Sequence, residues 1–172
     1  MATGLKSRVL YKVHEGDTNV APTSWAGEYR LMLRAKSIPS PVGERNMVDV
    51  STLEDDMEVQ EPGRRASASV ALQGAFEKTY LDQQVALAGQ KLDVIHLYGT
   101  DGLGSIGKLG YVGVPDVKPD DAEGDNHLTM TVNMAVSCVP EWISDDYDVT
   151  VTGEGDNMVF TVAVHTTTPS TP

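Results

Sequence analysis

Alternation of apolar and polar side chains with a period of two dominates this chain. In His127–Cys138 every even position carries an apolar side chain or the cysteine, and most odd positions are polar. A period of two places the two sets on opposite faces of a β-strand. Similar patterns predict further strands at Tyr29–Lys36, Ser67–Phe76, Leu92–Tyr98, Lys108–Val114, Tyr147–Thr152 and Met158–His165. The pattern therefore predicts a mainly β fold.

A helical period occurs in one segment, at about residues 79–88. Thr79 and Asp82 have the spacing of a capping box, and Gly89 can end the helix. Its apolar side chains fall on one face, which comprises Phe76, Tyr80, Leu81, Val85 and Ala88. A helix this short is marginal alone, so we expect it to pack against the sheet.

The 172 residues suit one domain with a core of its own. We expect a β domain over residues 1–143, with a long loop at about 46–65. Residues 144–166 predict one further β-hairpin around the turn sequence GEGDN. Residues 167–172 have the composition of a disordered tail.

Acidic side chains are concentrated in the last third of the chain. The net charge is −12, and residues 114–172 hold one basic and 11 acidic side chains. Phosphate binding needs basic surface, so a tight nucleic-acid binder is disfavoured, as is binding to an anionic membrane. The single cysteine, Cys138, excludes an internal disulfide and a cysteine-based zinc site. We find no signal peptide and no apolar run that could span a membrane, which favours synthesis in the cytoplasm.

Several segments resemble chemical motifs, but their context favours simpler interpretations. Gly99–Lys108 matches phosphate-loop spacings, yet a β-like segment follows it where a helix is required, so we predict a hairpin loop. Asp116–Asn126 does not have the order of a calcium loop and is expected to be a solvated acidic turn. The four histidines show no metal-binding spacing. Cys138 is expected to be a buried small hydrophobe. These features predict no catalytic residue, no cofactor and no metal, and a protein that is not an enzyme.

The acidic stretch Val48–Arg65 is the most informative part of the chain. It is too polar for a core strand and too long for a tight turn, and loops of this length are either functional or disordered. One interpretation is a floppy surface loop. The other is an extended arm that contacts another copy of the protein.

Three blocks of the chain resemble the tail tube, or major tail, proteins of siphophages, which have long non-contractile tails. Ile38–Arg65 contains the segment DVSTLED at Asp49–Asp55, with Ser51 where that family usually has Thr. Phe76–Leu92 resembles the family's single helix, and Gly110–Trp142 resembles its closing strands. Residues 144–172 extend beyond the resemblance.

The resemblance implies a β-sandwich or barrel-like domain with one flanking helix and a long extended loop. It implies a structural virion protein, assembled in the host cytoplasm, whose hexameric rings stack into a tail tube. The implied partners are other copies of the chain, the tape measure protein, and the tail tip and tail terminator proteins, without a membrane. Double-stranded DNA would pass through an acidic lumen during ejection without specific binding.

Two groups of residues follow as candidates for these roles. The long loop would contact the next ring through Asp49, Ser51, Thr52, Leu53, Glu54, Asp55, Asp56, Glu58, Glu61, Arg64 and Arg65. Like charge would keep phosphates from binding the lumen wall. The candidates for this lumen charge are Asp116, Asp120, Asp121, Glu123 and Asp125.

Two other functions remain open from the sequence. A tube protein of a contractile injection system would share the ring and add a sheath partner. A β-sandwich module that binds carbohydrate or a host surface would need an aromatic platform, for which Trp25 and Trp142 are available.

Overall fold

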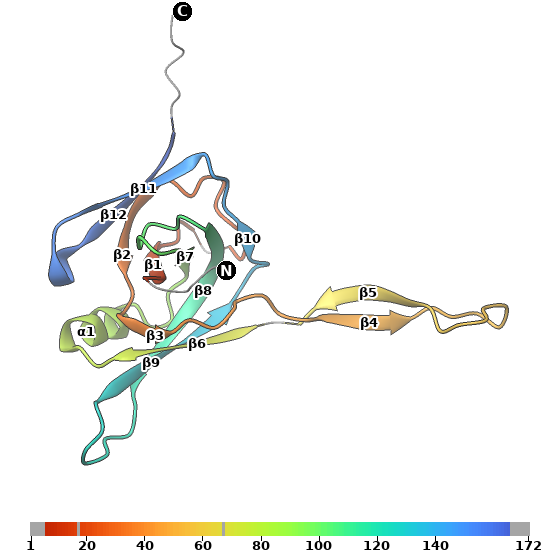
Figure 1. Ribbon diagram of the computed structural model, residues 1–172, viewed down its shortest axis with the longest axis horizontal. Coiled ribbons are helices and arrows are strands. Elements are labelled where there is room, and N and C mark those ends of the chain that lie inside the picture. Colours follow the sequence, from red (N-terminus) through yellow and green to blue (C-terminus); the bar gives the residue numbers. More distant parts are fainter. Residues whose placement is uncertain (1–5, 17, 67, 166–172) are drawn as a thin grey trace, which may run out of the picture.

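The computed structural model describes residues 6–16, 18–66 and 68–165, and the expected tail at 167–172 lies outside them. The fold is mainly β with one α-helix, as predicted (Figure 1). The strands are β1 (Arg8–Val13), β2 (Gly27–Leu31), β3 (Ala35–Ser37), β4 (Arg45–Asp49), β5 (Gln60–Arg65), β6 (Ser69–Ala75), β7 (Leu92–Tyr98), β8 (Gly107–Pro119), β9 (Thr129–Val136), β10 (Glu141–Trp142), β11 (Tyr147–Thr152) and β12 (Val159–Val164). The helices are α1 (Lys78–Ala86) and a short 3-10 turn, Gly155–Asn157.

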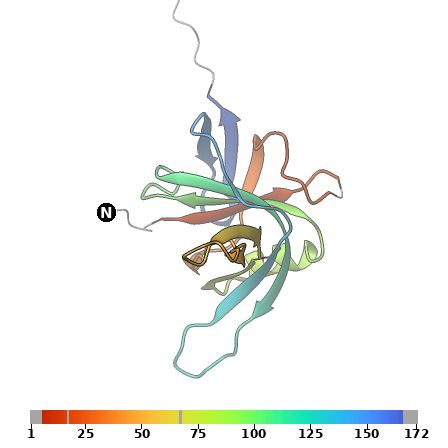
Figure 2. The same ribbon diagram turned by 90° about the vertical axis from the view of Figure 1, so that its right-hand side faces the viewer.

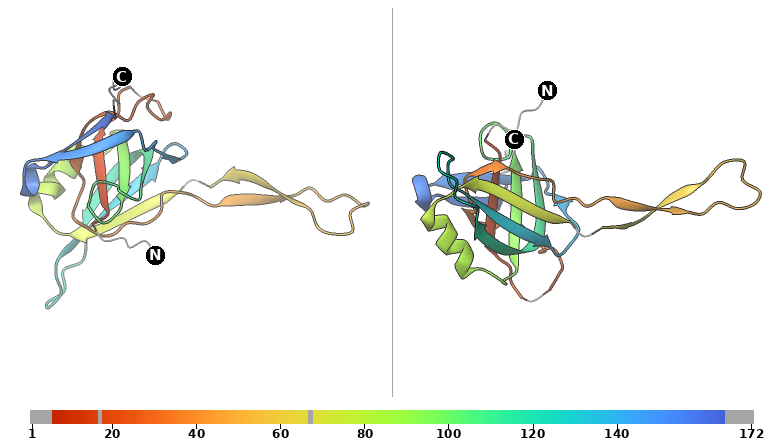
Figure 3. Two further views of the ribbon diagram at one scale, coloured as in Figure 1. Left: turned by 45° about the horizontal axis from the view of Figure 1, so that its top comes forward. Right: turned by 90° about the horizontal axis from the view of Figure 1, so that it is seen from below.

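Ten strands form one antiparallel sheet in the order β11-β12-β2-β1-β7-β8-β9-β6-β3, and β10 pairs with β8. The chain bends at Met32–Arg34, between β2 and β3. The part before the bend pairs with β1 and the part after it pairs with β6, so this one segment joins the two ends of the strand series β1-β7-β8-β9-β6 into a circle. The Met32 amide donates to the Val9 carbonyl at 3.0 Å, and the Ala75 amide donates to the Arg34 carbonyl at 3.2 Å. This bend closes the sheet into a barrel-like body (Figure 3).

The alternation in the sequence determines which side chains fill the body. Met130, Val132 and Met134 of β9 are fully buried. In the neighbouring strand β6, the buried Val70 lies opposite Met134 and the buried Leu72 opposite Val132. Strand β7 is buried at six successive positions, because both of its faces are covered. The predicted strands at 92–98 and 147–152 have the observed bounds, whereas His127–Cys138 shortens to β9 and Tyr29–Lys36 divides at the bend.

The helix is present, but its predicted cap is wrong and its predicted apolar face is only partly correct. It begins after Glu77, which makes no side-chain cap, and Asp82 forms an ion pair with Lys78 where a capping box with Thr79 was expected. Its buried residues are Tyr80 and Gln84, whereas Val85 is 57% exposed. The helix does pack against β8. No described helix is long and apolar enough to cross a membrane.

Two hairpins project from the body. Strands β4 and β5 form a separate two-stranded sheet, and we call residues 45–65 the arm (Figure 1). The β8–β9 hairpin projects at another edge, as seen when looking along the arm (Figure 2). The expected C-terminal hairpin is also present, and its strand β12 pairs with β2 as part of the main sheet.

Candidate interaction surfaces

The arm is an ordered β-hairpin with almost no buried surface. Its strands pair from Arg45 opposite Arg65 to Asp49 opposite Gln60. Every residue of the arm is exposed except Gly63, which is half-buried. The structure thus has a paired hairpin where the first interpretation expected an irregular loop, and its extended shape agrees with the second interpretation.

Polar side chains at the end of the arm fix its own turn. The Val59 amide donates to Ser51 Oγ at 2.7 Å, and the Ser51 amide donates to Asp49 Oδ1 at 2.9 Å. The Thr52 amide donates to Asp55 Oδ2 at 2.6 Å. The hydrogen bonds from Ser51 hold the pKa of Asp49 below its usual value. Four of the eleven arm candidates thus order the tip.

The remaining tip residues point into solvent. Leu53 has a relative exposure of 108% and Met57 of 79%, and both are flanked by Glu54, Asp56 and Glu58. Five more apolar side chains near or along the arm are 39–57% exposed, namely Val42, Met47, Val48, Val50 and Val59. Apolar side chains gathered on a projecting element are typical of a protein interface.

The basic residues of the arm lie at its root. Arg65 Nη1 donates to the Gly43 carbonyl at 3.0 Å, and Arg64 precedes it on β5. A Cβ on Gly43 would lie 2.1 Å from the Ala66 carbonyl, so only glycine allows this close approach. The structure separates Arg64 and Arg65 from the acidic tip of the same chain.

The five lumen candidates share the β8–β9 hairpin. Asp116 is exposed on β8, and Asp121, Glu123 and Asp125 are exposed in the connecting loop. Asp120 has a structural role: its carboxylate accepts from Thr129 at 2.6 Å and from Thr131 at 2.7 Å, and these bonds lower its pKa. The hairpin is therefore a concentrated acidic projection, braced at its base by Asp120.

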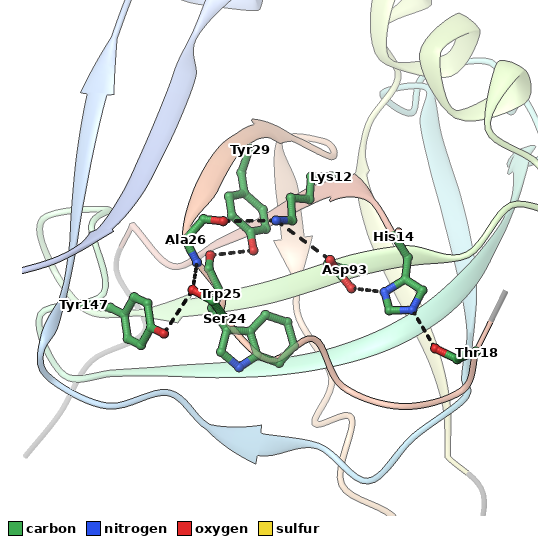
Figure 4. Close-up of polar contacts among 9 residues, drawn as sticks. All are labelled: Lys12, His14, Thr18, Ser24, Trp25, Ala26, Tyr29, Asp93 and Tyr147. Atoms are coloured by element: carbon green, nitrogen blue, oxygen red, sulfur yellow. Dashed lines mark hydrogen bonds and ion pairs between the residues drawn. The ribbon is translucent and has the colours of Figure 1, made fainter. Parts of the chain in front are cut away.

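The histidines showed no metal-binding spacing in the sequence, and the structure pairs two of them with acids. His165 Nδ1 lies 2.6 Å from Asp148 Oδ2 at the surface, and His14 is paired with an acid in the interior. His14 Nδ1 lies 2.6 Å from Asp93 Oδ1, and His14 Nε2 lies 3.3 Å from the Thr18 hydroxyl (Figure 4). Lys12 Nζ lies 4.0 Å from Asp93 Oδ2 and donates to the Ala26 carbonyl at 3.1 Å. Desolvation raises the pKa of the buried Asp93 carboxyl, which its basic neighbours oppose.

This cluster ties the connection between β1 and β2 to the sheet. It borders a hollow of about 460 Å³ that is lined by residues of the same connection. The Tyr29 hydroxyl donates to the Trp25 carbonyl at 2.8 Å, and Ser24 Oγ lies 3.4 Å from the Tyr147 hydroxyl of β11 (Figure 4). Threonine, histidine and aspartate have the connectivity of a nucleophile, a base and an orienting acid. We interpret their contacts as a clamp, because His14 links Thr18 to Asp93 near the start of the connection and Lys12 links Ala26 to the same carboxylate near its end.

A second buried histidine organises the surface at the end of β7. His96 is fully buried, with Nε2 3.0 Å from the Tyr111 hydroxyl and Nδ1 3.2 Å from the Tyr98 hydroxyl. Burial lowers the pKa of His96 to about 4, so the ring is neutral at pH 7. The Tyr98 ring lies 6.2 Å from that of Trp142, which is 69% exposed. The other tryptophan, Trp25, is buried and donates to Glu141 at 2.8 Å.

The structure also shows where the glycine-rich segment and the single cysteine lie. Gly99–Lys108 connects β7 to β8 as a hairpin, with Gly102 and Gly104 at positive φ. Cys138 is half-buried, and its sulfur accepts from the Val112 amide at 3.2 Å. Among the described residues, no group of three His, Cys, Asp or Glu side chains is placed to hold a metal ion.

The chain matches no protein-family model and no curated protein sequence.

Proposed function

We propose that this protein is a non-enzymatic structural subunit of a siphophage tail tube, which assembles into stacked hexameric rings. The arm is the observation that carries the proposal. It projects away from the body, so the body of the same molecule cannot cover its apolar tip (Figure 1). A two-stranded hairpin is marginally stable in water without further packing. A second copy of the chain would supply that packing.

The barrel-like body is a suitable wall element for such a tube. Its circle of strands has few open edges, while β11 and β3 end the strand order. Edge strands present unpaired backbone groups and invite pairing with another chain. The acidic β8–β9 hairpin is suited to a lumen through which DNA slides, because like charge opposes phosphate binding. The tape measure protein would occupy this lumen before DNA.

The proposal is tested by purifying the protein and examining it by negative-stain electron microscopy and by size-exclusion chromatography with light scattering. Rings or hollow tubes are the expected result. A matched variant replaces residues 50–59 with Asn-Gly, a two-residue turn that preserves the pairing of Asp49 with Gln60. This variant should remain folded and monomeric, with a mass slightly below the 18.5 kDa of the full chain.

Two outcomes would contradict the proposal. Normal tubes from the shortened variant would show that the arm does not hold the assembly. A wild-type chain that stays monomeric at high concentration, even with a tail-tip complex added as initiator, would instead favour a binding module.

A further inference from the structure

A hollow of about 280 Å³ lies on the body beside Tyr98. We call it the acceptor hollow, and it is lined by Ser7, Ala35, Lys36, Ile38 and Tyr98. Its volume is several times the roughly 30 Å³ that one water molecule occupies, which leaves room for an aliphatic side chain. None of these described lining residues is acidic. In a chain of net charge −12, such a surface is a favourable place for an acidic partner to approach.

Ring contacts position Tyr98, the aromatic wall of the acceptor hollow. The Tyr98 ring lies between His96, whose ring centroid is 6.1 Å away, and the exposed Trp142. A Cβ on Gly107 would lie 3.0 Å from Trp142 Cζ3, so the indole packs against the bare glycine backbone. Rigid aromatic side chains of this kind are typical of the centre of protein interfaces. The hydroxyl of Ser7 is buried and has no hydrogen-bond partner among the residues that the structure describes.

The arm tip has the complementary chemistry. It presents the apolar side chains of Leu53 and Met57 among the acids Glu54, Asp56 and Glu58. The acceptor hollow presents apolar and aromatic walls beside the exposed Lys36, and Lys6 is also exposed next to Ser7. Opposite charge around an apolar contact sets the register and speeds association. Because the arm points away from its own body, its tip can reach this hollow only on another molecule (Figure 3).

We propose that the acceptor hollow binds the arm tip of a second copy of this chain, with Leu53 seated beside Ile38 and Tyr98. This inference rests on the proposed function and specifies which surfaces meet. The two surfaces differ, so the contact is heterologous, and a bound pair of copies still has one free tip and one free hollow. Such a contact propagates along an axis, as the stacking of rings requires.

Cross-linking between two variants tests this contact directly. Each variant carries one thiol in a full-length Cys138→Ser background, which retains an acceptor for the Val112 amide. Leu53→Cys chains are mixed with Ile38→Cys chains under assembly conditions and treated with a short bismaleimide linker. The expected result is several-fold more covalent dimer than in a matched mixture with Val85→Cys, which places an exposed thiol on α1.

Charge reversal provides a second test of this contact. Lys36→Glu in the Ile38→Cys chain should reduce the dimer yield several-fold. Adding Glu54→Lys to the Leu53→Cys chain should restore it, because the two reversed charges attract again. Glu54 lies at the exposed tip outside the hydrogen bonds that fix the turn, so its reversal leaves the arm fold intact.

The possible failures are distinguishable. Normal tubes whose Leu53→Cys and Ile38→Cys thiols cross-link no better than the Val85→Cys control would overturn this contact and leave the tube proposal standing. Failure of the wild-type chain to assemble would overturn both. Cross-linking that is unchanged by Lys36→Glu would show that charge complementarity does not hold the tip in this hollow.

Discussion

The arm and the barrel-like body are both antiparallel β structure, yet they bury their side chains in opposite ways. In β9 of the body, Met130, Val132 and Met134 are fully buried. In β4 of the arm, Met47 is 57% and Val48 is 50% exposed. Strand pairing is common to both, so the difference shows that pairing alone does not provide a core. The body is stabilised by its own packing, whereas the arm leaves apolar surface for a partner to cover.

The two regions also order their turns differently. The β7–β8 turn in the body depends on glycine, with φ of +76° at Gly102 and +78° at Gly104. The end of the arm depends on side chains that bond to the backbone, such as Ser51 to Val59 and Asp55 to Thr52. Without a core beneath it, the arm tip needs these local bonds to present Leu53 in a fixed place.

The largest expected effect comes from one substitution made in both regions. Leu72→Ala removes a fully buried side chain of β6 and should lower the free energy of unfolding by about 2–5 kcal/mol. Leu53→Ala removes a side chain with 108% relative exposure and should leave that free energy unchanged. Urea unfolding of dilute monomers, followed by circular dichroism, measures both values.

The two substitutions should have the opposite ranking in their effect on assembly. Leu53→Ala should raise the concentration at which tubes form, whereas folded Leu72→Ala protein should assemble at nearly the wild-type concentration. Light scattering as a function of protein concentration measures this threshold. Equal thresholds for Leu53→Ala and wild type would remove the distinction drawn here between arm and body.

A titration from pH 7 to pH 4 acts on a buried group of the body, His96. Burial lowers the pKa of His96 from its usual 6.5 to about 4. Between these values the unfolded chain binds more protons than the folded chain, so the free energy of unfolding falls as the pH drops from 7 to 4. The contribution of His96 is about 3 kcal/mol at most, from about 1.4 kcal/mol for each pKa unit. Chemical unfolding at several pH values measures it.

The matched variant is His96→Gln, whose amide can bond to Tyr98 and Tyr111 but does not titrate between pH 4 and 7. It should show a shallower loss of stability with acid than the wild type, since carboxylates titrate in both proteins. An identical slope in the two proteins would mean that His96 is not held neutral by burial.

Sequence patterns predicted the body better than the arm, for a physical reason. Strand β7 is buried on both faces and strand β9 on one face. Buried positions require apolar side chains, so an apolar run reveals the first strand and apolar–polar alternation the second. Strands β4 and β5 bury neither face, and Pro62 and Gly63 lie within β5. Their sequence therefore has no strand periodicity, and the stretch was expected to be a loop.

The polar clamp was missed for a different reason. His14 and Asp93 are 79 positions apart in the chain and meet only because β1 pairs with β7, with Val13 opposite Leu92. Strand β1 itself was not predicted, so no register could bring the two side chains together. The helix face was only partly predicted: Tyr80 is buried as expected, but Gln84 takes a buried position that apolarity would give to Val85.

A smaller effect is expected where each projecting hairpin is braced by one aspartate. Asp120→Ala removes an acceptor for Thr129 and Thr131 on the β8–β9 hairpin, and Asp55→Ala removes the acceptor for the Thr52 amide at the arm tip. Each lost hydrogen bond is worth about 1 kcal/mol. Hydrogen exchange should speed up near Asn126 and Thr52, respectively. Unchanged exchange at Thr52 would show that the arm tip is ordered by something other than Asp55.

The smallest effect concerns the charges of the arm. Glu54→Gln with Asp56→Asn removes two exposed acids without changing the apolar tip. An exposed ion pair contributes only about 0–1 kcal/mol and is screened by salt, so the variant should assemble at a threshold within a few-fold of wild type. Its threshold should also respond less to added sodium chloride. The apolar side chain of Leu53 would then provide most of the attachment and the acids its orientation. An effect larger than that of Leu53→Ala would reverse this ranking and make the arm an electrostatic contact.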